Sequence, residues 1–280
     1  MAEKWDVIIT PKTSFFKNVF PELIKSRNLI HMLVKRDFKT MYKQTILGPL
    51  WLILRPLMSA GIFTLVFSYI AKLSTNGIPD ILFYMTGNIL WTLFTGILLS
   101  CSSTLLSNYG IFSKVYFQRL AVPFATALSR VYVFLIQFAA LLVIYICYAF
   151  KGSAISINLW AIATPVLLAE LVILAIGIGI IAASVTVKYR DLSILISFGV
   201  SLLMYLTPIV YPLSAVPEKF KWMLCLNPVT PIVEAFRYGW FSAGDIMPFY
   251  MVVSLLVTTA IFMFGVYLFN RVQKNFVDLI

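Results

Sequence analysis

The sequence predicts an all-α polytopic membrane protein, and three observations support that fold class. Of the 280 residues, 61% are hydrophobic and 12% are charged, with a mean hydropathy of +0.93. These values exclude a soluble globular domain. The apolar residues gather in long runs, each near or above the ~20 residues that a helix needs to cross a bilayer. The charged residues lie mostly between these runs.

The apolar runs predict six transmembrane helices. They comprise residues 50–71, 81–106, 124–149, 157–187, 192–212 and 247–269. Six crossings place the two ends of the chain on the same side of the membrane.

The basic residues predict which side that is, because cytoplasmic loops are enriched in Lys and Arg. Besides the basic N-terminal tail, the expected cytoplasmic residues are Lys114, Arg119, Lys188, Arg190, Arg271 and Lys274. The opposite side carries fewer, namely Lys72, Lys151, Lys219, Lys221 and Arg237. Both termini are therefore predicted to be cytoplasmic. The formal net charge of +11 is explained by this topology signal, and we expect no nucleic-acid partner.

Residues 1–49 are predicted to form a cytoplasmic tail and then an amphipathic helix over 21–43. Its apolar side carries Ile30, Leu33, Val34, Phe38, Met41 and Tyr42. Its polar side carries Lys35, Arg36, Lys39 and Lys43. We expect the helix to lie in the membrane interface with its lysines toward anionic lipid, and packing on a soluble partner is the less favoured alternative. Gly48-Pro49 is expected to end it and turn the chain into the membrane.

A short segment between the second and third runs, Leu106 to Pro123, is rich in aromatic residues. On a helix, Tyr109, Phe112 and Tyr116 share one face and Lys114 lies off it. An aromatic face on the water side indicates a surface that presses against a partner. The alternative is a helix that lies on its own membrane with its rings among the headgroups. The residues alone leave both interpretations open.

The loop between the last two runs is cut by prolines into pieces too short to span. Pro217 is expected to open a helix that runs to about Leu226. Thr230 is expected to cap a second helix that runs to about Trp240. Within it, Glu234 and Arg237 are three residues apart and can pair at a half-buried position. The pattern indicates re-entrant or rim-lying helices on the external side.

The sequence shows no catalytic constellation. It contains no paired carboxylates, no metal-ligand set, no nucleophile beside a base and no Gly-x4-Gly-Lys-Ser/Thr loop. Cys101, Cys147 and Cys225 are far apart and are expected to act as small hydrophobes. We therefore expect no catalytic residue, metal or cofactor on this chain, with any ATP hydrolysed by another chain.

A few charged residues lie inside the predicted spans: Arg55, Arg130 and Glu170. Such a residue normally faces a cavity or a partner, because a charge at mid-membrane costs about 2.5–3.5 kcal/mol on insertion scales. Arg55 is close enough to the membrane surface to reach the headgroups instead, and both interpretations stay open. Glu170 is expected to face protein or water.

Aromatic rings and small residues also recur within the spans. Gly and Ser in the second and fourth runs indicate close helix packing, with a polar path as the alternative. Rings at span ends indicate an interfacial belt. Rings that lie deeper could stack on sugars in a channel or serve simply as packing. They are Phe63, Phe67, Trp91 and Tyr205.

In a series of short motifs, the chain resembles a known family, the permease subunits of ABC-2-type polysaccharide exporters. The first matching motifs are Val34-Lys35-Arg36-Asp37-Phe38-Lys39, Tyr42-Lys43 and Leu47-Gly48-Pro49-Leu50-Trp51. Further along are Lys114-Val115-Tyr116-Phe117, Tyr189-Arg190-Asp191-Leu192, Thr207-Pro208-Ile209-Val210-Tyr211-Pro212, Leu226-Asn227-Pro228 and Glu234-Ala235-Phe236-Arg237. Each motif alone is weak, but their shared order over nearly the whole chain is specific.

The resemblance implies a function and a set of site residues. Residues 1–49 would hold an interface helix with Lys35, Arg36, Asp37, Lys39 and Tyr42, and residues 50–280 the six-helix transmembrane domain. The segment 107–122 would be a coupling helix that contacts an ATPase through Tyr109, Phe112, Lys114, Tyr116 and Phe117. The segment 213–245 would form gate helices, with gate residues Pro212, Trp222, Asn227, Glu234 and Arg237. Channel or substrate residues would be Arg55, Phe63, Phe67, Trp91 and Tyr205.

The implied assembly is a homodimer with two copies of a P-loop ATPase that holds the ATP and Mg. It would export lipid-linked O-antigen, capsule or teichoic acid across the bacterial cytoplasmic (inner) membrane. Two departures stand out: Gln118 replaces a Pro of many relatives, and no Gln lies near Ser201. Two rival functions are an ABC-2 exporter of drugs or lipids and a membrane-embedded glycosyl- or acyltransferase.

Overall fold

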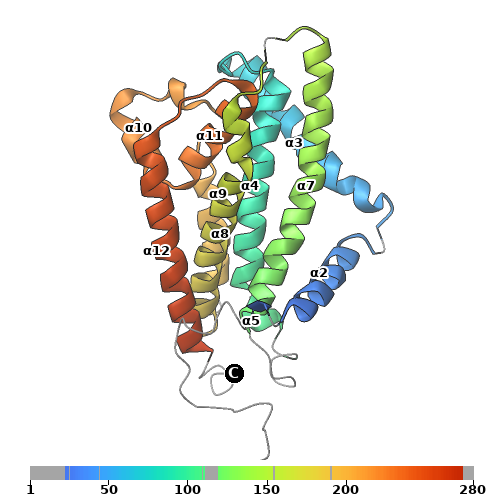
Figure 1. The fold of residues 1–280 in the computed structure, drawn as a ribbon, viewed down its shortest axis with the longest axis vertical. Helices are drawn as coiled ribbons and strands as arrows, with labels where there is room; N and C mark the ends of the chain where they lie inside the picture. Colours follow the sequence, from blue (N-terminus) through green and yellow to red (C-terminus); the bar gives the residue numbers. More distant parts are fainter. Residues whose placement is uncertain are drawn as a thin grey trace, which may run out of the picture.

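The computed structural model describes residues 23–24, 26–43, 45–108, 110, 119–153, 155–189 and 191–273. These residues form helices and turns, with no strand among them. The all-α prediction is therefore confirmed for the described part of the chain. The long helices stand side by side, with α2 (Arg27–Tyr42) inclined at one end of the group (Figure 1).

Five helices are long and apolar enough to cross a membrane. The first combines the 3₁₀ turn η1 (Gly48–Leu50), α3 (Trp51–Phe63) and the π-helix η2 (Thr64–Ile70). The second and third are α4 (Asp80–Ser102) and α7 (Ala121–Phe150). The fourth joins the 3₁₀ turn η3 (Leu159–Ala163) to α8 (Thr164–Thr186), and the last is α12 (Pro248–Val272). Each corresponds to a predicted run.

The predicted fifth span is shorter than its apolar run. Helix α9 covers Leu192–Leu203, and residues 204–210 continue as turns. The prediction of a helix over 192–212 is therefore wrong beyond Leu203. Pro208 and Pro212 account for this, because proline has no backbone N–H and disfavours helix at the residue before it.

The second span also ends earlier than its apolar run, which extends to residue 106. Helix α4 stops at Ser102, and a separate short helix, α5 (Thr104–Ser107), follows. At this break the hydroxyls of Ser102, Ser103 and Thr104 donate to carbonyls three or four residues earlier. Such side-chain bonds compete with the helical ladder, which explains the interruption.

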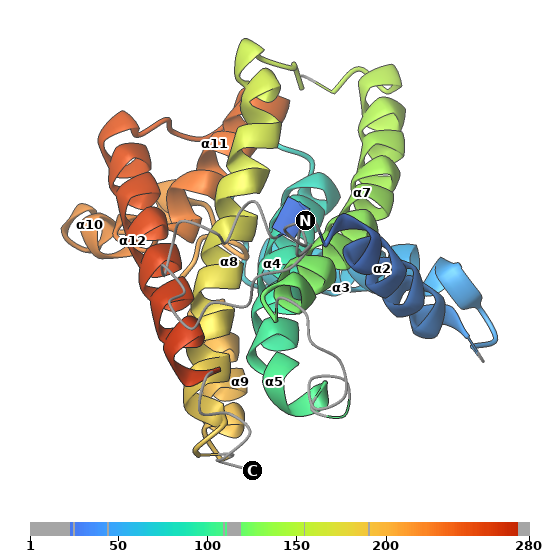
Figure 2. The ribbon, with the colours of Figure 1, turned by 60° about the horizontal axis from the view of Figure 1, so that its bottom comes forward.

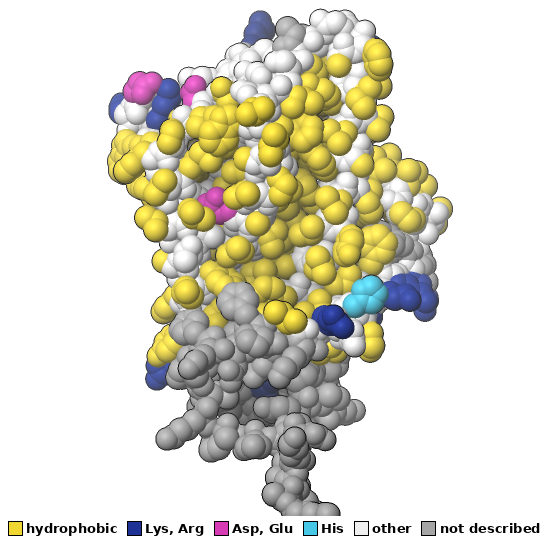
Figure 3. Space-filling view, viewed as in Figure 1, with side chains coloured by type: hydrophobic (Ala, Val, Ile, Leu, Met, Phe, Trp, Pro, Cys, Tyr) yellow, Lys and Arg dark blue, Asp and Glu magenta, His cyan; other side chains and the backbone are white. Residues whose placement is uncertain are grey.

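The short helices and the helix ends lie at two opposite ends of the molecule (Figure 1). Helix α2, helix α5 and the C-terminal end of α12 lie at one end of the molecule, and α10 (Glu218–Cys225) and α11 (Val229–Phe241) lie at the other. Figure 3 shows apolar side chains over the middle of one face with one acidic side chain among them, while most charged side chains lie toward the two ends: acidic and basic ones near α10, and basic ones beside the histidine near α2. This distribution is typical of a protein that crosses a bilayer.

Helix α4 forms the centre of the core. It packs against α3, α7 and α8, and α8 packs in turn against α12. Glycines allow these close approaches: a Cβ on Gly179 of α8 would lie 2.5 Å from Cys101 Cβ of α4. A Cβ on Gly177 would lie 2.9 Å from Phe262 Cα of α12. The prediction that small residues mark helix contacts is thereby confirmed.

We expect Gly179→Ala to lower the free energy of unfolding of the purified chain by about 1–3 kcal/mol, since the new methyl group overpacks the α4–α8 contact. Unfolding in mixed micelles, followed by circular dichroism, measures this. Gly199→Ala in α9 is the matched control, because nothing lies within 4 Å of its would-be Cβ. Equal stabilities for the two variants would contradict the packing argument.

Candidate functional site

The two short helices predicted near the external end are present as α10 and α11. Helix α10 begins directly after Pro217, as predicted, and Trp222 on this helix is 57% exposed. Its Glu218 accepts a hydrogen bond from Lys221 Nζ at 2.6 Å, and this bond raises the pKa of Lys221. Pro212, predicted with the gate residues, is buried just before these helices.

The start of α11 differs from the prediction. The helix begins at Val229, and Asn227 caps its first turn. The Asn227 Oδ1 atom accepts a hydrogen bond from the Val229 N–H at 3.1 Å. The Asn227 Nδ2 group donates to Thr207 Oγ1 at 2.9 Å, which joins α11 to the turns after α9. Thr230 was the predicted cap, but its Oγ1 is buried without a hydrogen-bond partner. The carboxamide of Asn227 can both accept and donate, and it fills the role expected of Thr230.

The predicted Glu234–Arg237 pair is present, and it is buried more deeply than expected. Arg237 Nη1 lies 3.3 Å from Glu234 Oε1, with the side chains 1% and 5% exposed respectively. The expectation of a half-buried position is wrong, because Arg237 has further partners inside the protein. It donates to the carbonyl oxygens of Pro208 at 2.6 Å and Ile209 at 2.9 Å.

Arg237 also reaches the central helix. Its guanidinium carbon lies 3.8 Å from the centre of the Phe83 ring on α4. A Cβ on Gly87 of α4 would lie 2.8 Å from Ile209 O and 2.9 Å from Arg237 Nη2. Arg237 therefore holds three parts together: α11, α4 and the irregular chain after α9.

Helix α11 is fixed at its other end too. Trp240 Nε1 donates to Thr164 Oγ1 at 2.9 Å, and the Asn158 N–H donates to Gly239 O at 2.8 Å. The Trp240 ring contacts the Phe138 ring edge-on at 5.0 Å. Helix α11 is consequently a part of the core, and α10 is the more exposed of the two helices.

The four rings predicted to meet a substrate have different surroundings. Phe63 and Phe67 are half-buried and cluster with Tyr84 at centroid distances of 5.9–6.3 Å. Tyr205 is 63% exposed. Trp91 is only 6% exposed and packs on Phe94, so in this structure its ring has no open face for a sugar. A channel role remains a prediction for the other three.

A cavity of about 520 Å³ with both polar and apolar lining residues lies between α2, α3, α4 and α7. It brings together Arg55 of α3 and Arg130 of α7, which lie far apart in the sequence. The other lining residues are Met41, Thr45, Trp51, Leu52, Pro56, Ser59, Asn88, Thr92, Val133 and Gln137. Arg55 lines this cavity and is also exposed, so both interpretations of Arg55 stay open.

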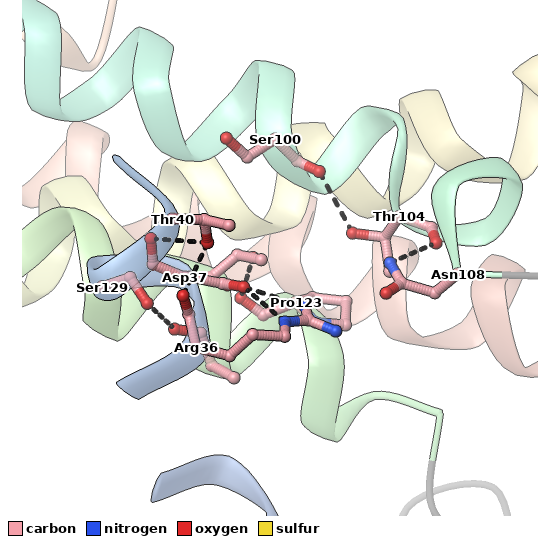
Figure 4. A network of polar contacts seen from close by, with 10 residues as sticks. Arg36, Asp37, Thr40, Ser100, Thr104, Asn108, Pro123 and Ser129 are labelled. Atoms are coloured by element: carbon pink, nitrogen blue, oxygen red, sulfur yellow. Dashed lines mark hydrogen bonds and ion pairs between the residues drawn. The ribbon is translucent and has the colours of Figure 1, made fainter. Parts of the chain in front are cut away.

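A smaller cavity of about 310 Å³ adjoins the first and shares Met41 and Arg130 with it. Its lining adds Asp37, Thr40, Ser100, Thr126 and Ser129. Figure 4 shows how α2 brings Asp37 and Thr40 up to α4 and α7. Asp37 Oδ1 accepts from Arg36 Nε at 3.0 Å and Nη2 at 2.8 Å, so this acid is paired on its own helix.

Glu170 faces protein, as predicted. It is 8% exposed, and its Oε1 lies 2.5 Å from Ser254 Oγ of α12. Ser254 Oγ is also 2.9 Å from Pro228 O, next to the start of α11. This contact joins α8, α12 and α11, and it is structural in character.

A sequence profile of the ABC-2 type transporter family matches residues 28–241, well over half of the chain. The chain belongs to the ABC-2 type transporter family.

This ABC-2 chain is similar to proteins named for O-antigen export and for polysialic acid transport. It is 27% identical over 256 residues to the O-antigen export system permease protein RfbA of Klebsiella pneumoniae, covering 90% of this chain and 95% of that protein. It is 25% identical to RfbA of Myxococcus xanthus, covering 77% and 81%. It is 24% identical to the polysialic acid transport protein KpsM of Escherichia coli, covering 83% and 92%. The resemblance seen in the motifs is confirmed.

The predicted amphipathic helix of the ABC-2 chain is present as α2, but part of its apolar face packs inside the protein. Leu33 and Val34 are buried, because α2 packs against α7 of the same chain. The expectation that this face lies in the acyl boundary is corrected accordingly. Lys35, Arg36 and Lys39 are exposed, whereas the side chain of Tyr42 lies outside the described part.

The predicted coupling residues Tyr109, Phe112, Lys114, Tyr116 and Phe117 lie outside the described residues. The residues that flank this segment are described. Asn108 Nδ2 donates to Thr104 O at 3.0 Å, and Arg119 Nη1 donates to Gln273 O after the end of α12. The segment therefore starts and ends at the same end of the molecule as α2 and the C-terminal end of α12 (Figure 2).

The sequence interpretation missed several residues of the cavity. Gln137 is the clearest case: it is 4% exposed, and its Nε2 donates to Leu52 O of α3 at 3.2 Å. The available signal was an amide in the middle of an otherwise apolar run, which costs free energy unless it has partners. Ser59 and Thr92 carried no comparable signal, since small hydroxyl residues are common in transmembrane helices.

We expect Arg237→Met to lower the free energy of unfolding by about 3–5 kcal/mol, because it leaves Glu234 as an unpaired buried charge and two carbonyls without donors. Unfolding of the purified chain in mixed micelles measures this. The double variant Glu234→Gln/Arg237→Met should recover part of the loss.

Lys221→Met is the control for this prediction, because it breaks the exposed Glu218–Lys221 pair. We expect no resolvable change in its unfolding midpoint. An Arg237→Met protein as stable as the wild type would show that Arg237 does not hold these elements together.

Proposed function

We propose that this chain is the channel-forming permease subunit of an ABC transporter that exports a lipid-linked polysaccharide, O-antigen-like or capsular, across the cytoplasmic membrane. The observation that carries the proposal is the match to O-antigen export permeases along 90% of the chain, within the ABC-2 family. The sequence has no phosphate-binding loop, so a separate P-loop ATPase would supply the energy.

The passage would form between two copies of the chain. Helix α4 and its neighbours fill the interior of one copy with side chains, whereas α3 and α9 expose large apolar residues. On α3 these include Met58 and Ile62, and on α9 they include Ile194 and Phe198. Such surfaces suit contact with lipid or with a second copy. The half-buried rings of Phe63 and Phe67 and the exposed ring of Tyr205 would then line the polymer path, where flat apolar faces attract sugar C–H groups.

The motor would act from the end that carries α2, α5 and the C-terminal end of α12. There the segment 107–122 would contact the ATPase through the aromatic face of Tyr109, Phe112 and Tyr116. Closure of the ATPase would push this segment, and the tightly packed α4, α7 and α8 would transmit the shift. At the opposite end, α10 would be the mobile part of the gate, because α11 belongs to the core.

The test uses a strain that lacks this chain. We expect the wild-type gene to restore the surface polysaccharide, whereas Phe112→Ala/Tyr116→Ala restores less than about a tenth, because loss of aromatic contact area uncouples the motor. Surface polysaccharide is measured by immunoblot, and membrane insertion and ATPase retention by co-purification from membranes.

Tyr69→Ala is the matched control, since it removes an exposed ring at the opposite end of the molecule. It should export like the wild type. Normal export by Phe112→Ala/Tyr116→Ala would contradict the proposal that the segment 107–122 is the coupling helix. Accumulation of a drug or a simple lipid in the deletion strain, without any glycan, would favour the rival exporter function.

A further inference from the structure

Helix α9 ends inside the membrane. It begins near the end of the molecule that carries α5, because the preceding helix, α8, ends at Thr186, whose hydroxyl donates to Ser102 O at the end of α4. The 12 residues of α9 span only about 18 Å of a hydrocarbon layer that is ~30 Å thick. The chain then continues as turns over residues 204–209. We call these residues the break of α9.

Contacts with α4 place the break at a similar depth. A Cβ on Gly87, in the second turn of α4, would lie 2.8 Å from Ile209 O. At ~1.5 Å of rise per residue, Gly87 is about 10 Å from Asp80, where α4 begins at the opposite end of the molecule. Both counts therefore place the break between the two membrane surfaces, within the hydrocarbon layer.

Part of the break is exposed on the surface of the chain. Tyr205 is 63% exposed and Leu206 is 50% exposed, whereas Thr207 and Ile209 are buried. Irregular backbone that faces lipid does not occur within the hydrocarbon layer, because its polar groups find no partners there. Such backbone is tolerated where it is buried in protein or lines a water-filled space. The exposed part of the break is therefore not a lipid-facing surface.

The hydrogen bonds at the break identify one carbonyl that needs a donor. The N–H groups of Tyr205 and Leu206 donate to Leu202 O and Leu203 O at 3.0 and 3.1 Å. Tyr205 O accepts from the hydroxyl of Tyr211 at 3.0 Å. Among the described residues, none donates to Leu206 O. An acceptor in this position is stable beside water or a hydroxyl group and costly beside hydrocarbon.

A row of hydroxyl groups leads along α9 to the break. Ser193, Ser197 and Ser201 are exposed and four residues apart, and Tyr205 continues the spacing. The hydroxyls of Ser197 and Ser201 donate to carbonyls one turn earlier, at 2.9 and 3.0 Å, so their oxygens are still able to accept. The row alone would also suit helix packing. It gains a further meaning because it ends at the exposed carbonyl of Leu206.

This surface suits a polymer that carries many hydroxyl groups better than it suits a second copy of the chain. A protein surface has to place a donor opposite each acceptor, whereas water and sugar hydroxyls offer donors from many directions. The exposed ring of Tyr205 adds a flat face for the C–H groups of a sugar.

We propose that the break of α9, at Tyr205 and Leu206, lines a water-filled path within the membrane, and that Leu206 O accepts hydrogen bonds there from hydroxyl groups of a glycan in transit. The inference rests on the proposed function for the identity of the polymer. The water-filled path itself rests on the depth, exposure and irregular backbone of the break.

The test measures how fast a charged, water-soluble maleimide labels a single thiol in opened membranes that contain the full chain. Cys147→Ala removes the exposed native cysteine, and Cys101 and Cys225 are buried. In this background we expect Leu206→Cys to be labelled about tenfold or more faster than a lipid-facing thiol, because the reacting thiolate forms in water. Its export should stay within about twofold of the wild type, since surface substitutions usually change stability little.

Leu256→Cys on α12 is the matched control, because Leu256 is 65% exposed on the outer side of a long apolar helix. Its depth is similar to that of the break. Ser254, in the same turn of α12, contacts Pro228 O, and the neighbouring Asn227 donates to Thr207.

Two results would overturn the path. One is labelling of Leu206→Cys as slow as that of Leu256→Cys. The other is slow labelling of Leu206→Cys together with a disulfide between two copies of this variant, which would place the break against protein.

The glycan is tested by comparing two strains that both carry Leu206→Cys, one that makes the surface polysaccharide and one in which its synthesis is blocked. We expect labelling to be about threefold or more slower where the polysaccharide is made, as for a ligand that occupies its site most of the time. The labelling rate of Leu256→Cys should be the same in both strains. A Leu206→Cys rate that does not depend on the polysaccharide would contradict the assignment to a glycan.

Failure of this inference and failure of the proposed function are distinguishable. Fast labelling of Leu206→Cys in a chain whose deletion leaves the surface polysaccharide unchanged would retain the water-filled path and lose the function. Normal export by a chain in which Leu206→Cys and Leu256→Cys are labelled equally slowly would retain the function and lose the path.

Discussion

Every backbone polar group within a bilayer needs a partner inside the protein, and this constraint organises the structure. Over most of the chain, the backbone hydrogen bonds within the helices satisfy this requirement. Helical hydrogen bonds do not satisfy it at residues 204–212, because Pro208 and Pro212 interrupt the regular helix there. Arg237 supplies the missing donors there, to the carbonyl oxygens of Pro208 and Ile209. Glu234 balances the charge of that arginine, and Gly87 gives it room beside α4.

The helices differ in how much of their surface is buried within one copy of the chain. Helices α4, α8 and α11 share close contacts, and 72% of the apolar stretch of α4 is buried. By contrast, only Pro56 and Ala60 are buried within Gly48–Ile70, and α9 exposes Ile194, Leu195, Phe198 and Leu202. The larger cavity lies where α2 and α3 meet α4 and α7.

The local features of the chain could be predicted from the sequence. Apolar runs marked the long helices, Pro217 marked the start of α10, and the three-residue spacing of Glu234 and Arg237 marked their pairing. The break of α9 at Leu203 could also have been found, because Pro208 lies inside the run. Local sequence patterns could not predict how one helix packs on another. Helix α4 is apolar over most of its surface, so its sequence alone did not indicate that Trp91 faces the core. Likewise, only the fold brings Arg55, Arg130 and Gln137 to one cavity.

The central claim is that this chain is a conduit driven by a separate motor, and transport in inside-out membrane vesicles tests it most directly. The vesicles contain this chain and its ATPase, and lipid-linked polysaccharide is supplied on their outer face. The measured quantity is the fraction of polysaccharide that becomes protected from an added glycosidase. The account predicts protection that requires ATP and both chains. Protection that develops without ATP, or without the ATPase chain, would contradict it.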